Sequence, residues 1–296
     1  MFGAGLALLT SLAWSISSIC VKLVAGKVDS LTINTLRTCV GSFLLASFVL
    51  SSGRMEVLFS TPWSSLIYVV LSGLLAMVLG DTVYIKSVSL LDVSIAFPLS
   101  QCAFILLAVL AAVLFLDEPL TWVTFLGAVL IILGIYLMTA SRGRRGSPTE
   151  RKPVHPKGLL FILIAILAWT GATILLKVGV TGVDPFIAAG VRISTSAVVL
   201  LALYLLRRGR GATSLRNIGR QHLILVASAG FLTYGVAAVG YITAIQWIGA
   251  GKTVLLTAIA PIFALPFAIV ILKEKPTRFT VWGVMVGVIG VWLVTV

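Results

Sequence analysis

Apolar residues in this chain fall into ten long runs that are separated by shorter polar connections. Each run is close to the ~20 residues that a helix needs to cross a hydrocarbon layer of ~30 Å at ~1.5 Å per residue. A segment in lipid must satisfy its own backbone hydrogen bonds, and the runs are too long and too uniformly apolar for barrel strands. The pattern therefore predicts an all-α membrane protein with ten transmembrane helices, over residues 3–25, 31–52, 64–88, 92–116, 121–140, 158–180, 185–206, 222–247, 251–272 and 278–296.

The composition agrees with this prediction. The chain has 296 residues, of which 59% are hydrophobic and 10% are charged, whereas about 25% of the residues of a soluble protein are charged. The first run lacks a basic leader, and its Ala13-Trp14 pair recurs inside the sixth run, so we expect a retained helix and not a cleaved signal. Cys20, Cys39 and Cys102 lie inside predicted spans and indicate no disulfide framework.

The sequence is duplicated. Four residues of the first half recur 155 positions later, namely Trp14, Lys22, Asp29 and Arg37 as Trp169, Lys177, Asp184 and Arg192. A Glu/Pro motif recurs 156 positions later, since Glu118-Pro-Leu-Thr121 matches Glu274-Lys-Pro-Thr277. These matches predict a first five-helix unit over residues 1–140, a basic linker over 141–157 and a second five-helix unit over 158–296.

Each unit holds an odd number of spans, so two tandem copies must insert in opposite orientations. The expected architecture is a 5+5 inverted-topology repeat, in which a substrate site lies near the midplane between the units. Two inverted units can open such a site to each side of the membrane in turn. We therefore expect transport by alternating access.

The formal net charge is +13, and most of it lies in two connections. Residues 141–157 contain six Lys or Arg and one acidic residue, and residues 207–221 contain five Arg and no acidic residue. Both connections follow odd-numbered spans, whereas the opposite side shows only Arg54 and Lys252. The positive-inside rule then places the basic connections in the cytoplasm and both termini outside. Binding of these connections to anionic headgroups of the lipid bilayer predicts the same side, and nothing indicates a nucleic-acid partner.

Several motifs together resemble a known family. The repeated Ala-Trp pair, the Glu-Pro-Leu-Thr motif followed by Gly127 and Gly134, and the segment Gly80-Asp-Thr-Val-Tyr84 resemble the EamA-type branch of the drug/metabolite transporter superfamily over essentially the whole chain. The resemblance implies a ten-helix inverted-repeat carrier of small metabolites, often an exporter of amino acids or related compounds. It also implies cytoplasmic termini, in conflict with the charge bias, and for this chain we follow the charge bias. We expect an integral protein of a prokaryotic plasma membrane.

Asp81 is the acidic residue that lies well inside a predicted span, about two-thirds of the way along residues 64–88. A carboxylate inside the membrane indicates function. Because burial disfavours its charge, it could exchange a proton during transport, or it could pair with a substrate ammonium group. The alternative is a structural aspartate that pairs with Lys86 or with helix backbone. Tyr84, three residues on, lies on much the same helical face.

Other polar and aromatic side chains at mid-span complete the predicted substrate site. Mid-membrane Trp and Tyr can line a cavity and stack on planar substrates, small hydroxyl residues let helices approach, and Pro98 and Pro261 free backbone carbonyl groups, as in the broken helices of transport sites. The alternative is ordinary helix packing. The predicted substrate-binding residues are Trp14, Ser18, Asp81, Tyr84, Gln101, Trp169, Thr173, Tyr234, Tyr241 and Lys252.

Lys252 belongs to this set because it would lie at the N-terminal end of the ninth span. A lysine beside a helix N-terminus suits a carboxylate or a phosphate, and together with Asp81 it would suit a zwitterion. The alternative is an interfacial lysine. The segment Gly249–Thr253 resembles the end of a phosphate-binding loop, but that motif needs a glycine where Gln246 stands and a preceding strand, so it indicates no nucleotide hydrolysis.

Charged residues also surround the first and sixth connections. Inversion would place these two clusters on opposite faces, where pairs of an aspartate with a nearby cation could break and form during gating. The alternative is that the cations snorkel and the aspartates end the helices, although both arginines lie nearly two turns inside their spans, where an unpaired charge is costly. The predicted gating or structural charges are Lys22, Asp29, Arg37, Lys177, Asp184 and Arg192.

The sequence as a whole favours a secondary active transporter that exports a small polar metabolite, with proton coupling as an option. A carrier of phosphorylated or lipid-linked substrates, similar to a flippase, is the alternative. We expect no enzyme activity, no metal and no cofactor, because His155 and His222 lie in connections and no catalytic set occurs inside the membrane. The GxxxG segment Gly283–Gly287 predicts helix packing, either within one chain or in a homodimer.

Overall fold

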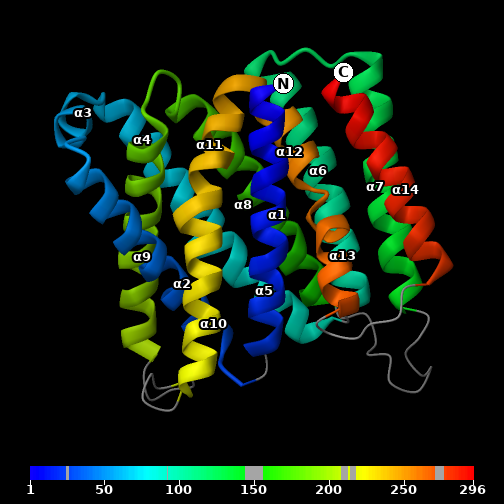
Figure 1. Ribbon diagram of the computed structural model, residues 1–296, viewed down its shortest axis with the longest axis horizontal. Helices are drawn as coiled ribbons and strands as arrows, with labels where there is room; N and C mark the ends of the chain where they lie inside the picture. The colour runs from blue at the N-terminus through cyan, green and yellow to red at the C-terminus, as the bar shows by residue number, and fades with distance from the viewer. Residues whose placement is uncertain (25–26, 92, 144–155, 208–212, 214–217, 271–276) are drawn as a thin grey trace.

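The computed structural model describes the chain except for residues 25–26, 92, 144–155, 208–212, 214–217 and 271–276. The described residues form helices joined by short connections (Figure 1). The elements are α1 (Phe2–Val24), α2 (Ser30–Ser51), α3 (Met55–Ser60), α4 (Trp63–Gly73), the π-helix η1 (Leu74–Gly80), α5 (Asp81–Leu90), α6 (Val93–Leu116), α7 (Trp122–Gly143), α8 (Pro156–Gly179), α9 (Pro185–Arg207), α10 (Arg220–Gly230), the π-helix η4 (Phe231–Val236), α11 (Ala237–Ile248), α12 (Ala250–Thr257), α13 (Ala260–Val270) and α14 (Arg278–Thr295).

Within the described residues, nine helical segments are long and apolar enough to cross a membrane, and the apolar part of α7, Trp122–Met138, is slightly shorter. These ten segments lie within a few residues of the ten predicted spans. Three spans consist of more than one element: α4, η1 and α5 form the third, α10, η4 and α11 the eighth, and α12 and α13 the ninth. The prediction of an all-α membrane protein is confirmed.

The two halves of the chain exchange their first helices. α1 packs against α10 to α13, the eighth and ninth spans, whereas α8 packs against α4, η1, α5 and α6, the third and fourth spans. The second span contacts the seventh through α2 and α9, and the fifth contacts the tenth through α7 and α14. Each of these contacts joins equivalent partners in opposite halves, as a 5+5 inverted repeat requires.

Glycines bring α7 and α14 close together. A Cβ atom built on Gly134 would lie 2.7 Å from the carbonyl oxygen of Gly283, and one built on Gly127 would lie 2.8 Å from that of Gly290. Gly287 also lies against Gly134. The predicted GxxxG segment therefore packs helices within one chain, where the absent side chains let the two backbones touch.

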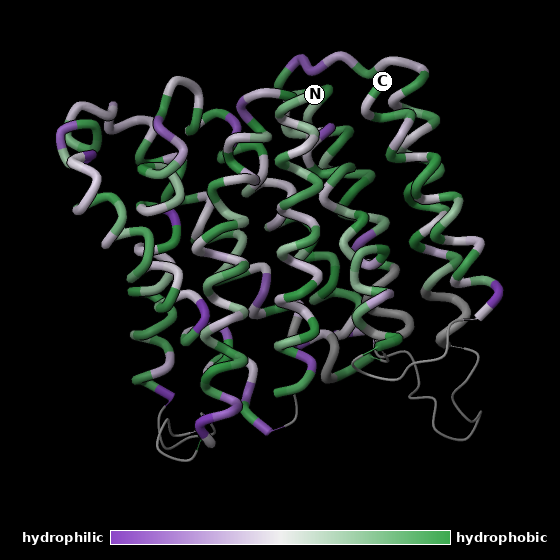
Figure 2. The backbone as a smooth tube through the Cα atoms, in the orientation of Figure 1, coloured by the Kyte–Doolittle hydropathy of each residue, from purple (hydrophilic) through white to green (hydrophobic). Residues whose placement is uncertain are grey.

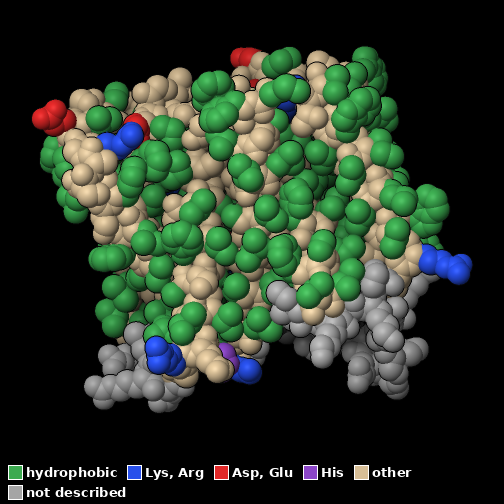
Figure 3. Space-filling model, viewed as in Figure 1, with side chains coloured by type: hydrophobic (Ala, Val, Ile, Leu, Met, Phe, Trp, Pro, Cys, Tyr) green, Lys and Arg blue, Asp and Glu red, His purple; other side chains and the backbone are tan. Residues whose placement is uncertain are grey.

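Both termini lie at one face of the helix bundle, as an even number of crossings requires (Figure 1). Hydrophilic stretches gather mainly at the two faces, with a few polar positions between them (Figure 2). In the side view of Figure 3, hydrophobic side chains cover the band between the faces. Large apolar side chains such as Phe43, Leu110, Val198 and Met285 are exposed, which is favourable only where lipid surrounds the protein.

The observed elements differ from the predicted ones at several places. The short helix α3 was not predicted, and neither was either π-helix. Residues 141–143 continue α7 and residues 156–157 begin α8, so the described ends of the predicted linker are helical, and its remainder lies outside the described residues. The ninth span breaks between Thr257 and Ala260, next to Pro261, as expected. α6 instead continues through Pro98, the sixth residue of the helix, so this proline does not end its helix.

Candidate functional site

A carboxylate bound by an indole lies at the contact between the two halves. Trp169 of α8 donates a hydrogen bond from Nε1 to Oδ1 of Asp81, the first residue of α5, over 3.0 Å. Ring centroids of Tyr84 and Phe104 lie 5.2 Å and 5.9 Å from that of Trp169. The structure therefore brings together three predicted site residues, Asp81, Tyr84 and Trp169, and adds Phe104.

Gly80 leaves room for this contact. A Cβ atom at position 80 would lie only 2.5 Å from Nε1 of Trp169, which is well inside van der Waals distance. Any larger residue would push the indole away from the neighbouring carboxylate. Gly80 and Asp81 thus act together, because the first makes the space in which the second accepts its hydrogen bond.

The third and eighth spans both contain a π-helix at this depth. η1 ends directly before Asp81, and η4 contains Tyr234. The two π-helices occupy nearly equivalent places in the two halves, about 156 residues apart. A π-helical turn holds more residues than an α-helical turn, so it changes the direction of the side chains that follow, and such turns are frequent at functional sites. In each half, therefore, a π-helix interrupts the regular α-helix of one span, next to Asp81 in the first half and at Tyr234 in the second.

Two arginines at equivalent positions of the repeat approach this carboxylate. Arg192 of α9 is buried, and its Nε donates to Oγ of Ser72 over 3.1 Å. Asp81 interacts electrostatically with both Arg37 and Arg192. Two positive charges and one negative charge thus lie within electrostatic range of one another inside the bundle.

A chain of hydroxyl groups holds Arg37. Its Nη2 donates to Oγ1 of Thr233 over 3.1 Å, and Thr233 donates to Oγ of Ser17 over 2.6 Å. The guanidinium carbon of Arg37 lies 5.3 Å from the centroid of the Tyr234 ring, a distance typical of a cation–π contact. The hydroxyl of Tyr234 donates to Oδ1 of Asn34 over 3.2 Å. These contacts hold the side chain of Arg37, which is a residue of α2, between α1 and η4.

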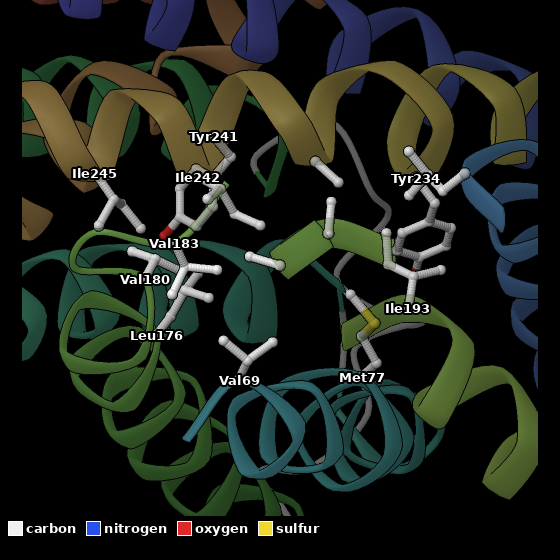
Figure 4. Packing of buried hydrophobic residues seen from close by; sticks show 14 residues of the cluster. Val69, Met77, Leu176, Val180, Val183, Ile193, Tyr234, Tyr241, Ile242 and Ile245 are labelled. Atoms are coloured by element: carbon white, nitrogen blue, oxygen red, sulfur yellow. The ribbon is translucent and has the colours of Figure 1, made fainter. Parts of the chain in front are cut away.

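Tyr234 and Tyr241 also belong to a buried apolar cluster beside these charges (Figure 4). Figure 4 shows the Tyr234 ring next to Ile193, with Tyr241 further along the same span. Trp14 packs against the cluster, with its ring centroid 5.4 Å from that of Tyr241. The Tyr241 hydroxyl lies close to the side chain of Thr173. Four more predicted site residues, Trp14, Thr173, Tyr234 and Tyr241, therefore lie around one contact region.

Lys252 lies elsewhere, in the first turn of α12 and toward the face that carries the termini (Figure 1). There the backbone N–H groups of Ala250 and Gly251 donate to the two carboxylate oxygens of Glu118, over 2.6 Å and 2.9 Å. The chain itself supplies the anion that was expected at this helix N-terminus, where a negative charge is favoured. The predicted zwitterion site of Asp81 and Lys252 is therefore not assembled in this structure.

The aspartate of the second predicted charge cluster caps a helix and pairs across the halves. Asp184 accepts hydrogen bonds from the backbone N–H groups of Phe186, over 2.9 Å, and Ile187, over 3.2 Å, at the start of α9. It also forms an ion pair with Arg54 from the other half. Lys177 donates instead to the carbonyl oxygen of Ile245 over 2.9 Å.

Asp29, the equivalent aspartate of the first half, caps α2. Its carboxylate accepts from the backbone N–H groups of Thr32, over 3.1 Å, and Thr213, over 2.6 Å. Lys22 lies in the last turn of α1. Both aspartates thus cap the helix that follows them and contact the other half, at opposite faces of the bundle. Their part in gating stays a prediction.

Two predicted site residues lie at the edge of this arrangement. Ser18 donates to the carbonyl oxygen of Ser15 in its own helix over 2.7 Å. Gln101 is partly exposed on α6 and follows Ser100, whose side chain forms a hydrogen bond with the Tyr84 hydroxyl.

The central arrangement also contains three residues that were not predicted, because as uncharged residues they do not stand out in the sequence of a span: Asn34, Thr233 and Phe104. Arg37 and Arg192 were predicted as gating or structural charges, whereas the structure places them near Asp81 in the central polar group. Their depth inside the spans was the signal that could have placed them there.

The chain is similar to known proteins over nearly its whole length. A model of the EamA-like transporter family matches residues 1–140 and 156–296. An uncharacterized transporter of Archaeoglobus fulgidus is 23% identical over 288 residues, which cover 97% of this chain and 96% of the relative. An uncharacterized transporter of Methanothermobacter thermautotrophicus is 27% identical over 218 residues, or 73% of this chain and 56% of the relative. A protein of known crystal structure is similar with a TM-score of 0.78 and 17% identity, over 99% of this chain and 96% of the other, which shows the fold alone.

Proposed function

The chain belongs to the EamA-like transporter family and is a membrane transporter of the drug/metabolite superfamily, and on that premise we propose that it exports a small polar metabolite by secondary active transport. An amino acid or a related compound matches the mixture of charged, hydroxyl and aromatic groups at the centre. The proposed units of movement are residues 1–140 and 158–296, and the proposed cycle needs no catalytic step.

One observation carries this proposal: the hydrogen bond from Trp169 to Asp81 joins the two halves in the interior of the bundle. α8 comes from the second half and packs on η1 and α5 of the first. Movement of residues 158–296 as a unit against residues 1–140 would change this contact. A ligand or a proton that acts on Asp81 can therefore act on the relative position of the halves.

Protonation of Asp81 provides a physical route to proton coupling. A neutral carboxyl group accepts a weaker hydrogen bond from Trp169 than a carboxylate does. It also loses the attraction to Arg37 and Arg192, which is strong in a medium of low dielectric constant. Proton binding would thus loosen α8 from α5, and proton release would restore their contact.

Transport by purified protein in proteoliposomes tests this function. Uptake of labelled amino acids, nucleosides and sugar phosphates would be measured with and without a pH gradient, for the native chain and for Asp81→Asn. The matched control is Glu56→Gln, which makes the same acid-to-amide change at an exposed residue of α3. We expect accumulation that follows the gradient in the native and control proteins and is lost in Asp81→Asn.

Two results would contradict the proposal in different ways. Gradient-driven accumulation that survives Asp81→Asn would remove this residue from the coupling mechanism. Failure of every soluble compound, together with movement of a labelled lipid between leaflets, would replace the small-metabolite carrier by the flippase-like alternative.

Membrane orientation is a separate part of the proposal. The charge bias places both termini outside, so Ser52, after α2 at the face of the termini, would be outside and Gln221, at the start of α10, inside. Single cysteines, Ser52→Cys or Gln221→Cys in a chain without Cys20, Cys39 and Cys102, would be labelled in intact cells with a membrane-impermeant maleimide. We expect labelling of the first only, and the reverse pattern would place the termini in the cytoplasm.

A further inference from the structure

One buried side-chain amide connects the two π-helices. Asn34 of α2 is buried, and its Nδ2 donates to the backbone carbonyl oxygen of Met77 in η1 over 3.4 Å. Its Oδ1 accepts from the hydroxyl of Tyr234 in η4 over 3.2 Å. Met77 and Tyr234 belong to one buried apolar cluster, and Figure 4 shows both side chains close to Ile193. An amide of the first half therefore joins the interrupted spans of both halves.

The two residues that Asn34 bridges are equivalent in the repeat. Each is the fourth residue of its π-helix. A Cβ atom on Gly73, directly before η1, would lie 2.7 Å from the carbonyl oxygen of Arg192, and one on Gly230, directly before η4, would lie 2.6 Å from that of Arg37. Both π-helices thus begin at the same contact with a matching arginine of the opposite half, and the amide bridges matching points.

The carbonyl group that Asn34 binds is the one that Asp81 would bind in a regular α-helix. An α-helical N–H donates to the carbonyl group four residues before it, which for Asp81 is that of Met77. In η1 this N–H donates instead to the carbonyl oxygen of Ala76, five residues before it. The Asn34 amide supplies a donor to the carbonyl group that has lost the Asp81 N–H. Because a buried carbonyl group without a donor costs free energy, the amide favours the π-helical form of η1.

The π-helical form of η1 in turn sets the direction of Asp81. Successive residues of an α-helix are about 100° apart around the helix axis. Loss of the additional residue in the π-helical turn would therefore rotate α5 against α4 by about this angle. The carboxylate of Asp81 would turn away from Nε1 of Trp169, which now donates to it. Asn34 can thus orient Asp81 through the backbone of the third span.

The second half has alanine at both equivalent positions. Ala189 stands 155 residues after Asn34, which is the displacement of the matching arginines in the same spans. Ala238 stands 157 residues after Asp81, which is the displacement of the two glycines before the π-helices. The amide therefore belongs to the half that has a carboxylate to orient.

We propose that Asn34 is a positioning residue for Asp81. Its amide holds η1 in the form that directs the carboxylate at Trp169, and Tyr234 fixes this amide from the second half. The inference rests on the proposed function, because it concerns the carboxylate through which proton coupling is proposed. Movement of η4 with the second half would withdraw the Tyr234 hydroxyl from Asn34 and so change the orientation of Asp81.

The NMR signal of the Trp169 indole N–H, measured on the full chain in detergent, tests the inference without transport. A hydrogen bond to a carboxylate moves an indole proton signal to lower field, and the signal that Trp169→Phe removes is assigned to this residue. Asn34→Leu removes the amide, with Asn34→Ala in reserve if the leucine variant does not fold, and Tyr234→Phe removes the hydroxyl. Ile131→Ala, at a buried residue of α7, controls for lost stability alone, and Tyr68→Phe makes the tyrosine change at an exposed residue of α4.

We expect the Trp169 signal to move to higher field in the Asn34 variant and in Tyr234→Phe, as it should in Asp81→Asn, whose amide is a weaker acceptor. It should keep its native position in both controls. A native signal in the folded Asn34 variant or in Tyr234→Phe, or an equal shift in Ile131→Ala, would overturn the inference. The expected shifts without any flux of the native chain in proteoliposomes would keep Asn34 as a positioning residue and contradict the transport proposal.

Discussion

Trp169 and Asp81 come from opposite halves of the chain, and a hydrogen bond of 3.0 Å joins the indole nitrogen of the first to the carboxylate of the second. Trp14, the equivalent of Trp169 in the sequence repeat, has no such acceptor among the residues that the structure describes. One pair of duplicated residues therefore has two different surroundings. The indole of Trp169 joins the halves through a carboxylate, and that of Trp14 does not do so among the described residues.

Trp169→Phe should destabilise the protein more than Trp14→Phe does. The first change leaves the carboxylate of Asp81 without its donor, which costs about 1–3 kcal/mol. The second removes an N–H that has no partner in the described part of the chain, so its cost is limited to a small change in packing. Thermal unfolding in detergent without ligand would compare the two variants. Equal losses of stability would show that the hydrogen bond contributes nothing beyond the ring.

Gly80→Ala should be destabilising by about 1–3 kcal/mol, because the new methyl group would overlap the indole of Trp169. Gly5→Ala is the matched control, since a Cβ atom there meets nothing within 4 Å. That change in an exposed helix position should stabilise α1 by about 0.5–1 kcal/mol. Unfolding midpoints of both variants in the same detergent would check the opposite signs. An unchanged midpoint in Gly80→Ala would mean that the indole can move without loss.

Glu118→Gln should weaken the contact between the connection after α6 and the start of α12. The carboxylate accepts hydrogen bonds from Ala250 and Gly251, and an amide offers one acceptor oxygen and no charge to the helix dipole. We expect a loss of about 1–2 kcal/mol in thermal unfolding. Glu56→Gln, at an exposed acid, should stay within about 0.5 kcal/mol of the native protein. If both variants lost a similarly small free energy of unfolding, the start of α12 would not depend on the carboxylate of Glu118.

Asp29 should make stability depend on pH in the acidic range. Burial opposes its ionisation, but hydrogen bonds from Thr32 and Thr213 outweigh this effect and hold the pKa of the carboxyl group below its ordinary value of 3.8. Because the pKa is lower in the folded protein, the stabilising contribution is present above pH 3.8 and is lost as the pH falls through the folded pKa.

Asp29→Asn tests this dependence, because the amide can still cap α2 but does not titrate. Unfolding midpoints between pH 6 and pH 3 should fall more steeply for the native chain than for the variant. Parallel curves would assign the acid sensitivity to other groups.

Much of the architecture could be predicted from the order of apolar and polar residues. The number and position of the spans followed from hydropathy, because in lipid a helix of fixed rise must match a layer of fixed thickness. The matching of Trp14 with Trp169 and of Arg37 with Arg192 predicted paired halves of opposite orientation. Asp81 was recognisable as a candidate site residue because a carboxylate inside a membrane is costly without a partner.

The sequence alone thus determined the spans, the duplication and the list of polar residues that the interior has to accommodate, since these depend on composition along the chain. Only the tertiary structure decided which of them meet. Asp81 pairs with Trp169 and not with a neighbour in sequence, and Glu118, not a ligand, lies at the N-terminus of α12. The π-helices change the direction of side chains in the third and eighth spans, and the hydropathy pattern does not predict this change. Contacts between distant helices depend on rotation and depth, which a linear pattern of residues leaves open.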